Sequence, residues 1–343
     1  MTGVRARGER IRRYILDRIG ESPEDVTRAA SERFGITRQA VNKHLQRLVN
    51  EGVLTRSGAT RARVYRLAPM VIWSDRFEIQ PGLAEDVVWA RKVKNILADV
   101  PDNISDIWEY GFTGMFNNAM DHSEGSAIDV HIRKTAVTTE MLIADDGRGI
   151  FRKIQHEMKL LDERHAILEL SKGKLTTDPD RHTGEGIFFS SRMFDSFDIM
   201  SGGVFFSHEF KDAEDWITET DRSSVGTSVW MSLGNHTART PKQIFDQYTS
   251  GDDYGFTKTV VPVKLAGYGS DRLISRSQAK WLLARIELFR TVLLDFDEVE
   301  TIGQAFADEI FRVFALQHPD IELIPVSAGP EVQKMIARAK ARL

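Results

Sequence analysis

Two glycine-rich turns constrain the middle of this 343-residue chain more than any other feature. The first is Asp145–Gly149 (DDGRG), which directly follows the apolar run Leu142–Ala144. The second is Gly184–Gly186 (GEG), which directly precedes the apolar run Ile187–Phe189. Glycine lets a backbone adopt left-handed conformations and approach a ligand without a Cβ in the way. The pattern predicts a strand that ends in the first turn and a helix that begins at the second.

Two further segments accompany these turns in a fixed order. Phe112–Ser123 (FTGMFNNAMDHS) predicts a helix that carries Asn117 and Asn118. Gly226-Thr227 is followed by Ser228–Ser232, which predicts a strand that closes a sheet behind the turns. The sequence has no GxxxxGK motif followed by Ser or Thr, so a P-loop is excluded.

In their order and approximate spacing, these segments resemble the ATP pocket of GHKL (Bergerat-fold) proteins over residues 69–234. The resemblance implies that ATP or ADP binds together with Mg²⁺. Asp145 would accept a hydrogen bond from the adenine amino group, and Asn118 would give Mg²⁺ an oxygen ligand. Gly184 and Gly186 would present backbone N–H groups to phosphate at a helix N-terminus. The nucleotide-binding residues implied are Asn118, Asp121, Asp145, Gly147, Gly149, Ile150, Lys172, Thr183, Gly184, Gly186 and Thr227, with Asn118 also the metal ligand.

The segment between the two turns holds about thirty mostly polar residues, among them Lys172-Gly173-Lys174. A segment with exposed charge and little core is typical of a part of the chain that opens locally. We therefore expect a mobile lid over the phosphates.

One position departs from the GHKL pattern. GHKL kinases and ATPases usually carry a carboxylate one helical turn before the magnesium asparagine, and this chain has Gly114 there. Glu109 precedes Asn118 by nine residues, which places it on the opposite helix face. Losing a general base lowers a rate by roughly 10² to 10⁴. We expect slow hydrolysis, or a nucleotide that is only sensed.

The N-terminal residues predict a second kind of domain. Helices are expected at Arg10–Ile19, at Glu24–Phe34 and from the N-cap Thr37 onward, followed by a basic hairpin over Val53–Leu67. Residues 1–68 thus resemble a winged helix-turn-helix domain, which implies double-stranded DNA as a partner. The DNA-contacting residues expected are Arg38, Gln39, Asn42, Lys43, Arg47, Arg61 and Arg63. The alternative is a three-helix scaffold whose basic face binds a protein.

The charge distribution favours DNA binding by this part alone. Residues 1–67 contain 15 Lys and Arg against 7 Asp and Glu, whereas the rest of the chain contains 31 against 43. A basic N-terminal part followed by an acidic remainder is expected when only one domain of a protein contacts nucleic acid.

The C-terminal residues predict a third domain. After a linker at 235–257, strands are expected at Val260–Ala266, Thr291–Phe296 and Ile321–Val326, alternating with helices at Ser277–Phe289, Gln304–Gln317 and Glu331–Arg342. Residues 258–343 resemble the STAS-like domains that partner GHKL kinases in bacterial anti-sigma switching. Those domains carry a phosphoacceptor serine, but the corresponding stretch Thr301–Ala305 has none. We expect a regulatory surface for a protein partner or for this chain itself.

The expected fold class is therefore an α+β multidomain protein: a winged helix, a GHKL α/β sandwich and a small STAS-like α/β domain. The chain has no cysteine, which excludes disulfides, thiolate metal sites and cysteine nucleophiles. No apolar run is long enough for a signal peptide or a membrane span, so we expect a soluble, cytoplasmic protein. The resemblance to the GHKL and STAS-like proteins of bacterial anti-sigma switching implies a bacterial protein. A homodimer is plausible because winged helices commonly bind paired half-sites.

Three functions remain open at this point. The leading hypothesis is a DNA-binding transcriptional regulator in which Mg·ATP gates the winged helix or an assembly. The alternative is an enzyme, either an anti-sigma-type serine/threonine protein kinase or a GHKL ATPase that acts on a partner protein; Gly114 and the missing serine count against it. The third is a scaffold whose pocket has degenerated.

Overall fold

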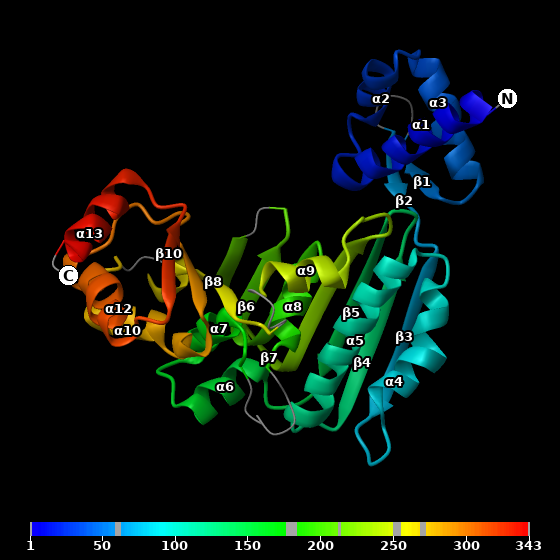
Figure 1. Ribbon diagram of the computed structural model, residues 1–343. Coiled ribbons are helices and arrows are strands. Elements are labelled where there is room, and N and C mark those ends of the chain that lie inside the picture. The colour runs from blue at the N-terminus through cyan, green and yellow to red at the C-terminus, as the bar shows by residue number, and fades with distance from the viewer. Residues whose placement is uncertain are drawn as a thin grey trace.

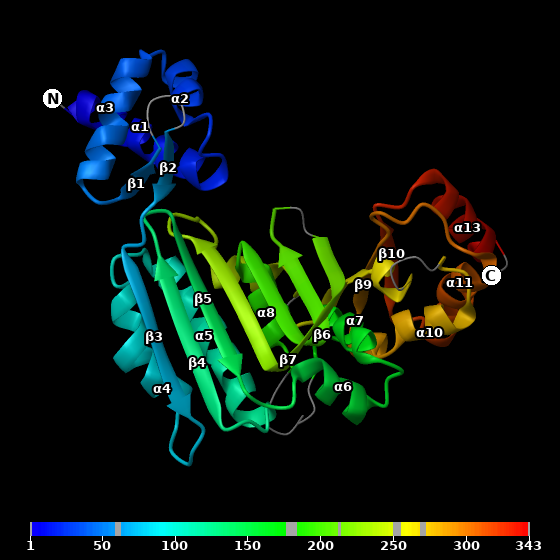
Figure 2. The ribbon, with the colours of Figure 1, turned by 180° about the vertical axis from the view of Figure 1, so that it is seen from behind.

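The computed structural model describes residues 2–58, 63–175, 184–211, 214–249, 255–267 and 272–341. In this part of the chain three sheets are each associated with helices, so the α+β multidomain class is confirmed (Figures 1 and 2). No helix among these residues is long and apolar enough to cross a membrane.

The N-terminal domain consists of three helices and a hairpin. They are α1 (Thr2–Glu21), α2 (Val26–Phe34), α3 (Arg38–Asn50), β1 (Leu54–Ser57) and β2 (Val64–Leu67). Gly35 ends α2 in the left-handed conformation, with φ of 60°, and the Thr37 hydroxyl caps α3 by accepting a hydrogen bond from Ala40 N at 3.2 Å. The apolar faces of the helices bury Ile15, Val41 and Leu45 in a core of their own. The predicted order of helices and hairpin is confirmed.

The central domain is a five-stranded antiparallel sheet with strand order β3-β4-β5-β7-β6. Its strands are β3 (Val71–Glu78), β4 (Ala127–Lys134), β5 (Thr138–Asp145), β6 (Ser196–Glu209) and β7 (Glu214–Gly234). Its helical segments are α4 (Glu85–Val88), η2 (Trp89–Val93), η3 (Lys94–Leu97), α5 (Asp102–His122), α6 (Ile150–Met158), α7 (Glu163–Lys172) and α8 (Gly186–Met193). Helices α4, α5 and α8 cover one face of the sheet, as the two opposite views show (Figures 1 and 2). The fully buried residues of α5 include Trp108, Phe112 and Phe116.

The C-terminal domain is a small parallel sheet with strand order β10-β9-β8. Its elements are β8 (Lys258–Pro262), η5 (Val263–Gly267), α10 (Arg276–Leu283), η6 (Ile286–Leu288), β9 (Thr291–Asp295), α11 (Gln304–Asp308), η7 (Glu309–Phe314), α12 (Ala315–Gln317), β10 (Glu322–Val326) and α13 (Pro330–Lys340). The predicted alternation of strands and helices is confirmed. The first strand is shorter than expected, because the chain turns into a 3-10 helix after Pro262.

The expectation of a linker at 235–257 was wrong. These residues contain α9 (Pro241–Gln247), which begins at a capping box on Thr240 and buries Ile244. Tyr248 and Phe256 then pack on the ring of Phe188 in α8, with ring centroids 4.9 and 4.6 Å apart. As a result, one continuous hydrophobic core runs through the central and C-terminal domains.

The expectation of a lid with little core was also wrong for the residues that the structure describes. Helices α6 and α7 occupy most of the segment and bury Ile154, Ile167 and Leu170 against the central domain. The rest of the expected lid, residues 176–183, lies outside the described residues.

Candidate functional site

A cavity of about 410 Å³ lies on the helix-covered side of the central domain. It is bounded by α5, the start of α6, the end of β5, the interior of β7 and the turn that opens α8. Cavities of this size are typical of small-molecule sites. Six of the predicted nucleotide-binding residues line it: Asn118, Asp145, Ile150, Gly184, Gly186 and Thr227.

Asp145 ends β5 and presents its carboxylate to the cavity. Its Oδ1 accepts hydrogen bonds from Gly147 N at 2.9 Å and from Thr227 N at 3.2 Å. Burial raises the pKa of Asp145, and the bonds from Gly147 and Thr227 partly oppose this. The carboxylate is thus fixed from the protein side, in an orientation that suits a hydrogen-bond donor on a ligand.

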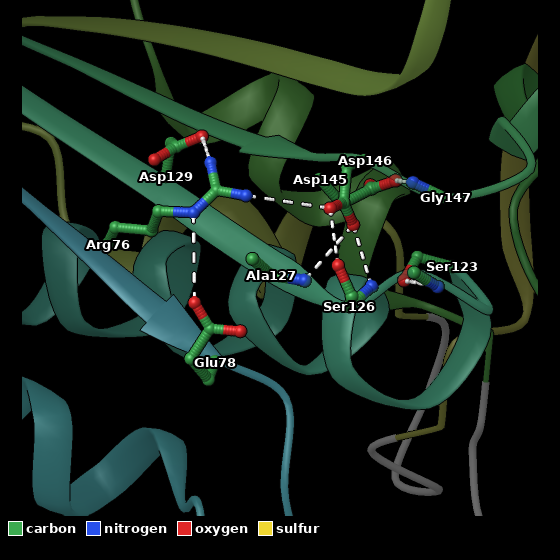
Figure 3. Close-up of polar contacts among 10 residues, drawn as sticks. Arg76, Glu78, Ser123, Ser126, Ala127, Asp129, Asp145, Asp146 and Gly147 are labelled. Carbon is green, nitrogen blue, oxygen red and sulfur yellow. Dashed lines mark hydrogen bonds and ion pairs between the residues drawn. The ribbon is translucent and has the colours of Figure 1, made fainter.

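The neighbouring carboxylate of Asp146 has a different task (Figure 3). Its Oδ1 accepts hydrogen bonds from Ser126 N at 2.7 Å and Ala127 N at 3.0 Å, and its Oδ2 accepts one from Ser126 Oγ at 2.6 Å. Arg76 lies 3.6 Å away on β3. The Ser126 hydroxyl and these backbone donors lower the pKa of Asp146 to about 2. Asp146 therefore ties the turn to the start of β4, and it does not line the cavity.

Gly147, in the first turn, and Gly226, in β7, allow the chain to lie very close to other backbone. A Cβ on Gly147 would lie 2.1 Å from the carbonyl oxygen of Ser123, which itself accepts a hydrogen bond from Arg148 N. A Cβ on Gly226 would lie 1.9 Å from the carbonyl oxygen of Asp145, and Gly226 has φ of 72°. Only glycine fits these contacts, so both residues shape the site without lining it with a side chain.

Helix α5 supplies one wall, on which Asn118 and Gly114 lie one turn apart and both line the cavity. A Cβ on Gly114 would have no neighbour within 4 Å, so the space that a carboxylate would need is open. Glu109 is exposed and does not line the cavity, as expected from its spacing.

Mg²⁺ fits this donor set only as part of a metal–nucleotide complex. Asn118 brings one neutral oxygen, and Mg²⁺ is usually bound through one or two protein groups together with phosphates and water. No cluster of three or more His, Asp or Glu side chains suited to a metal ion occurs in the described ranges.

Several cavity residues were not foreseen from the sequence, among them Glu85, Tyr110, Lys153 and Glu185. The side chain of Lys153 is largely buried, and its ammonium group donates to the His122 carbonyl oxygen at 3.0 Å. Lys153 follows Ile150 by three residues on α6, so helical spacing offered a signal for it. Burial raises the pKa of Tyr110, and the nearby Glu185 carboxylate raises it further.

The structure places the remaining predicted nucleotide-binding residues elsewhere. Lys172 does not reach the cavity, because its buried ammonium group donates to Glu169 Oε1 at 2.6 Å and to two carbonyl oxygens of the C-terminal domain. Asp121 is exposed at the end of α5 and does not line the cavity. Gly149, like Gly147, belongs to the turn beside the cavity. Thr183 lies outside the described residues.

Six of the seven residues predicted to contact DNA are exposed. Arg38, Gln39, Asn42, Lys43 and Arg47 are all exposed on α3, and Arg63 is exposed just before β2. Arg47 also donates to Glu51 Oε1 at 2.8 Å, so part of its charge is neutralised within the domain. Arg61 lies outside the described residues.

Comparison with known families identifies one part of the chain. Residues 278–333 match the STAS-like domain of unknown function (DUF4325), in agreement with the resemblance seen in the sequence. The match covers α10, β9, the helices of 304–317, β10 and the start of α13. No curated protein matches the chain.

Proposed function

We propose that the protein is an ATP-responsive DNA-binding transcriptional regulator that acts in the cytoplasm. In this proposal the central domain is a GHKL pocket for Mg·ATP or Mg·ADP, and the N-terminal domain is a winged helix-turn-helix. Nucleotide occupancy controls DNA binding or an assembly of the protein.

The observation that carries the proposal is the geometry of Asp145. This carboxylate lies at a strand end, is fixed by Gly147 N and Thr227 N, and lines a cavity. It is therefore suited to accept a hydrogen bond from the amino group of adenine. The same cavity extends to Asn118 and to the backbone of Gly184–Gly186 at the start of α8. That helix N-terminus is a suitable site for phosphate, and Asn118 is suited to a bridging Mg²⁺.

A rigid element connects the pocket with the N-terminal domain, which supports gating. Strand β5 ends at Asp145, and the turn before its start places Ala136 and Val137 against the core of the N-terminal domain. The eight residues of β5 span about 23 Å at the usual rise for a strand. A change at the pocket end of this strand therefore has a direct path to the DNA-binding domain.

Gly114 favours sensing over catalysis. The position one turn before Asn118 opens onto the cavity and carries no side chain that accepts a proton. We therefore place the kinase and ATPase alternatives second. An assay with radiolabelled ATP separates them, because transfer of stoichiometric label to a partner protein would identify a kinase.

The test of the proposal is titration of the full chain with operator-length duplex DNA, with and without Mg·ATP, alongside calorimetry of Mg·ATP binding. We expect Mg·ATP to bind and to change the DNA affinity. Equal DNA affinity in both conditions would refute gating, and an absence of nucleotide binding would refute the pocket itself.

A further inference from the structure

We propose that docking of the C-terminal domain on α7 sets the affinity of the cavity for nucleotide, with Arg285 as the positioning residue. This inference rests on the proposed nucleotide site and deepens it by naming its regulation.

The wall of the cavity beside α8 is continuous with the interface to the C-terminal domain. Leu170, Leu175 and Gly184 line the cavity, and Leu175 N donates to the Gly184 carbonyl oxygen at 3.1 Å. Between Leu170 and Leu175, Lys172 and Lys174 do not line the cavity and donate hydrogen bonds to carbonyl oxygens of the C-terminal domain. One short stretch of chain, residues 170–175, therefore borders both the cavity and the C-terminal domain.

Three hydrogen bonds fasten this stretch to the C-terminal domain. The Lys172 ammonium group donates to the carbonyl oxygens of Trp281 and Ala284 at 3.0 and 2.9 Å. The Thr259 hydroxyl donates to the Lys172 carbonyl oxygen at 2.7 Å. Together they hold both ends of Lys172, its backbone and its ammonium group, at the end of α7.

Arg285 completes the attachment from the other side. Its Nη1 donates to Glu169 Oε2 at 3.2 Å, and its Nη2 donates to the Lys174 carbonyl oxygen. The Lys174 ammonium group in turn donates to the Leu288 carbonyl oxygen at 2.9 Å. Arg285 and Lys174 both have left-handed backbones, with φ of 61° and 52°. Non-glycine residues hold this conformation only where the surrounding contacts maintain it, so both loops depend on each other.

The charges at this interface make the contact close to all-or-none. Glu169 and Lys172 are buried, with side chains 5% and 1% exposed, and the Arg285 side chain is 21% exposed. A buried charge that loses its partner is strongly unfavourable, so partial separation of the two surfaces is disfavoured. A contact with two discrete states is the kind of element that couples two sites.

Such coupling is reciprocal. If the docked state presents Leu170, Leu175 and Gly184 in the arrangement that binds nucleotide, undocking weakens binding. Nucleotide must then stabilise docking by the same factor. A partner that binds the undocked C-terminal domain would thereby release nucleotide.

The test compares Arg285→Met with Arg338→Met in the full chain. Arg338 is exposed on α13 of the same domain and serves as the matched control. We expect Arg285→Met to raise the Kd for Mg·ATP by about tenfold, within the usual range of allosteric coupling, and Arg338→Met to leave it unchanged. Arg285→Lys keeps the charge with fewer donors, so its Kd should lie between those of wild type and Arg285→Met.

A second readout follows the reciprocal effect. Hydrogen exchange at the amides of Ala284, Leu288 and Phe289 should slow when Mg²⁺ and a non-hydrolysable ATP analogue are added to the wild type. If Arg285→Met does not fold by circular dichroism, Lys174→Met removes the donor to the Leu288 carbonyl oxygen with a smaller change. Unchanged Kd in the folded variant, with unchanged exchange in the wild type, would overturn the coupling alone. Failure of the wild type to bind Mg·ATP would instead overturn the proposed function.

Discussion

Replacing Asp145 with asparagine changes one atom of the cavity and leaves the hydrogen bonds of the turn in place. The amide oxygen of asparagine can still accept from Gly147 N and Thr227 N, which now donate to Oδ1 at 2.9 and 3.2 Å. The atom on the other side of the group becomes an NH₂ donor. It would face the amino group of adenine, which is also a donor.

The size of the effect follows from the bond that is lost. A hydrogen bond to a charged group contributes about 1.5–3 kcal/mol, and every 1.4 kcal/mol changes an affinity by about tenfold. We therefore expect Asp145→Asn to raise the Kd for Mg·ATP by about 10- to 150-fold. The melting temperature should stay close to that of the wild type, because the turn keeps its bonds.

Asp146→Asn is the matched control, since it makes the same chemical change one residue along the chain. Asp146 holds Ser126 and Ala127 and does not line the cavity, so nucleotide affinity should not change. Stability should change instead. The pKa of Asp146 is about 2 when folded and about 3.9 when unfolded, so its ionised form stabilises the fold above about pH 4. This contribution is lost as the pH falls toward 2.

Calorimetry of Mg·ATP binding and acid unfolding of the wild type and both variants measure these effects. Equal Kd for Asp145→Asn and wild type would refute the assignment of the adenine site. A larger loss of affinity in Asp146→Asn than in Asp145→Asn would reverse the roles that we assign to the two carboxylates.

Three further predictions address other parts of the chain. Gly114→Ala should raise the free energy of unfolding by about 1 kcal/mol, because alanine is the better helix former and its Cβ would meet nothing within 4 Å. A loss of stability in thermal or denaturant unfolding would contradict this. Gly147→Ala should lower the free energy of unfolding by about 2–3 kcal/mol and weaken nucleotide binding, because its Cβ would lie 2.1 Å from the Ser123 carbonyl oxygen. Stability equal to that of the wild type would show that the turn is not as tight as described. Lys43→Ala should weaken DNA binding and reduce the slope of log affinity against log salt by about one, whereas Arg338→Ala should do neither in the same titration.

The parts of the fold that depend on local rules were predictable from the sequence. The end of α2 at Gly35 and the start of α3 after Thr37 follow from single residues whose conformational or capping preferences are strong. The same holds for the turn at Asp145–Gly149, where glycines allow contacts that other residues cannot make. These features need only a few adjacent residues to be recognised.

The errors arose where distant residues decide the outcome. The Lys-Gly-Lys sequence around Lys172 is typical of a phosphate-binding lysine. In the structure, however, its buried ammonium group donates to the carbonyl oxygens of Trp281 and Ala284, more than one hundred positions away. The supposed linker similarly owes its structure to Phe188, which Tyr248 and Phe256 meet across the fold. Neither contact has a local signature, so periodicity and spacing do not reveal it.

The continuous core between the central and C-terminal domains also limits how this architecture can be recombined in evolution or in the laboratory. A cut near residue 257 would separate Phe256 from Phe289, whose rings lie 5.2 Å apart, and expose apolar surface on both fragments. The N-terminal domain has its own core and is joined through a small contact at Ala136 and Val137. The N-terminal domain is therefore the part of this chain that can be exchanged, whereas the central and C-terminal domains must be kept together because they share one core.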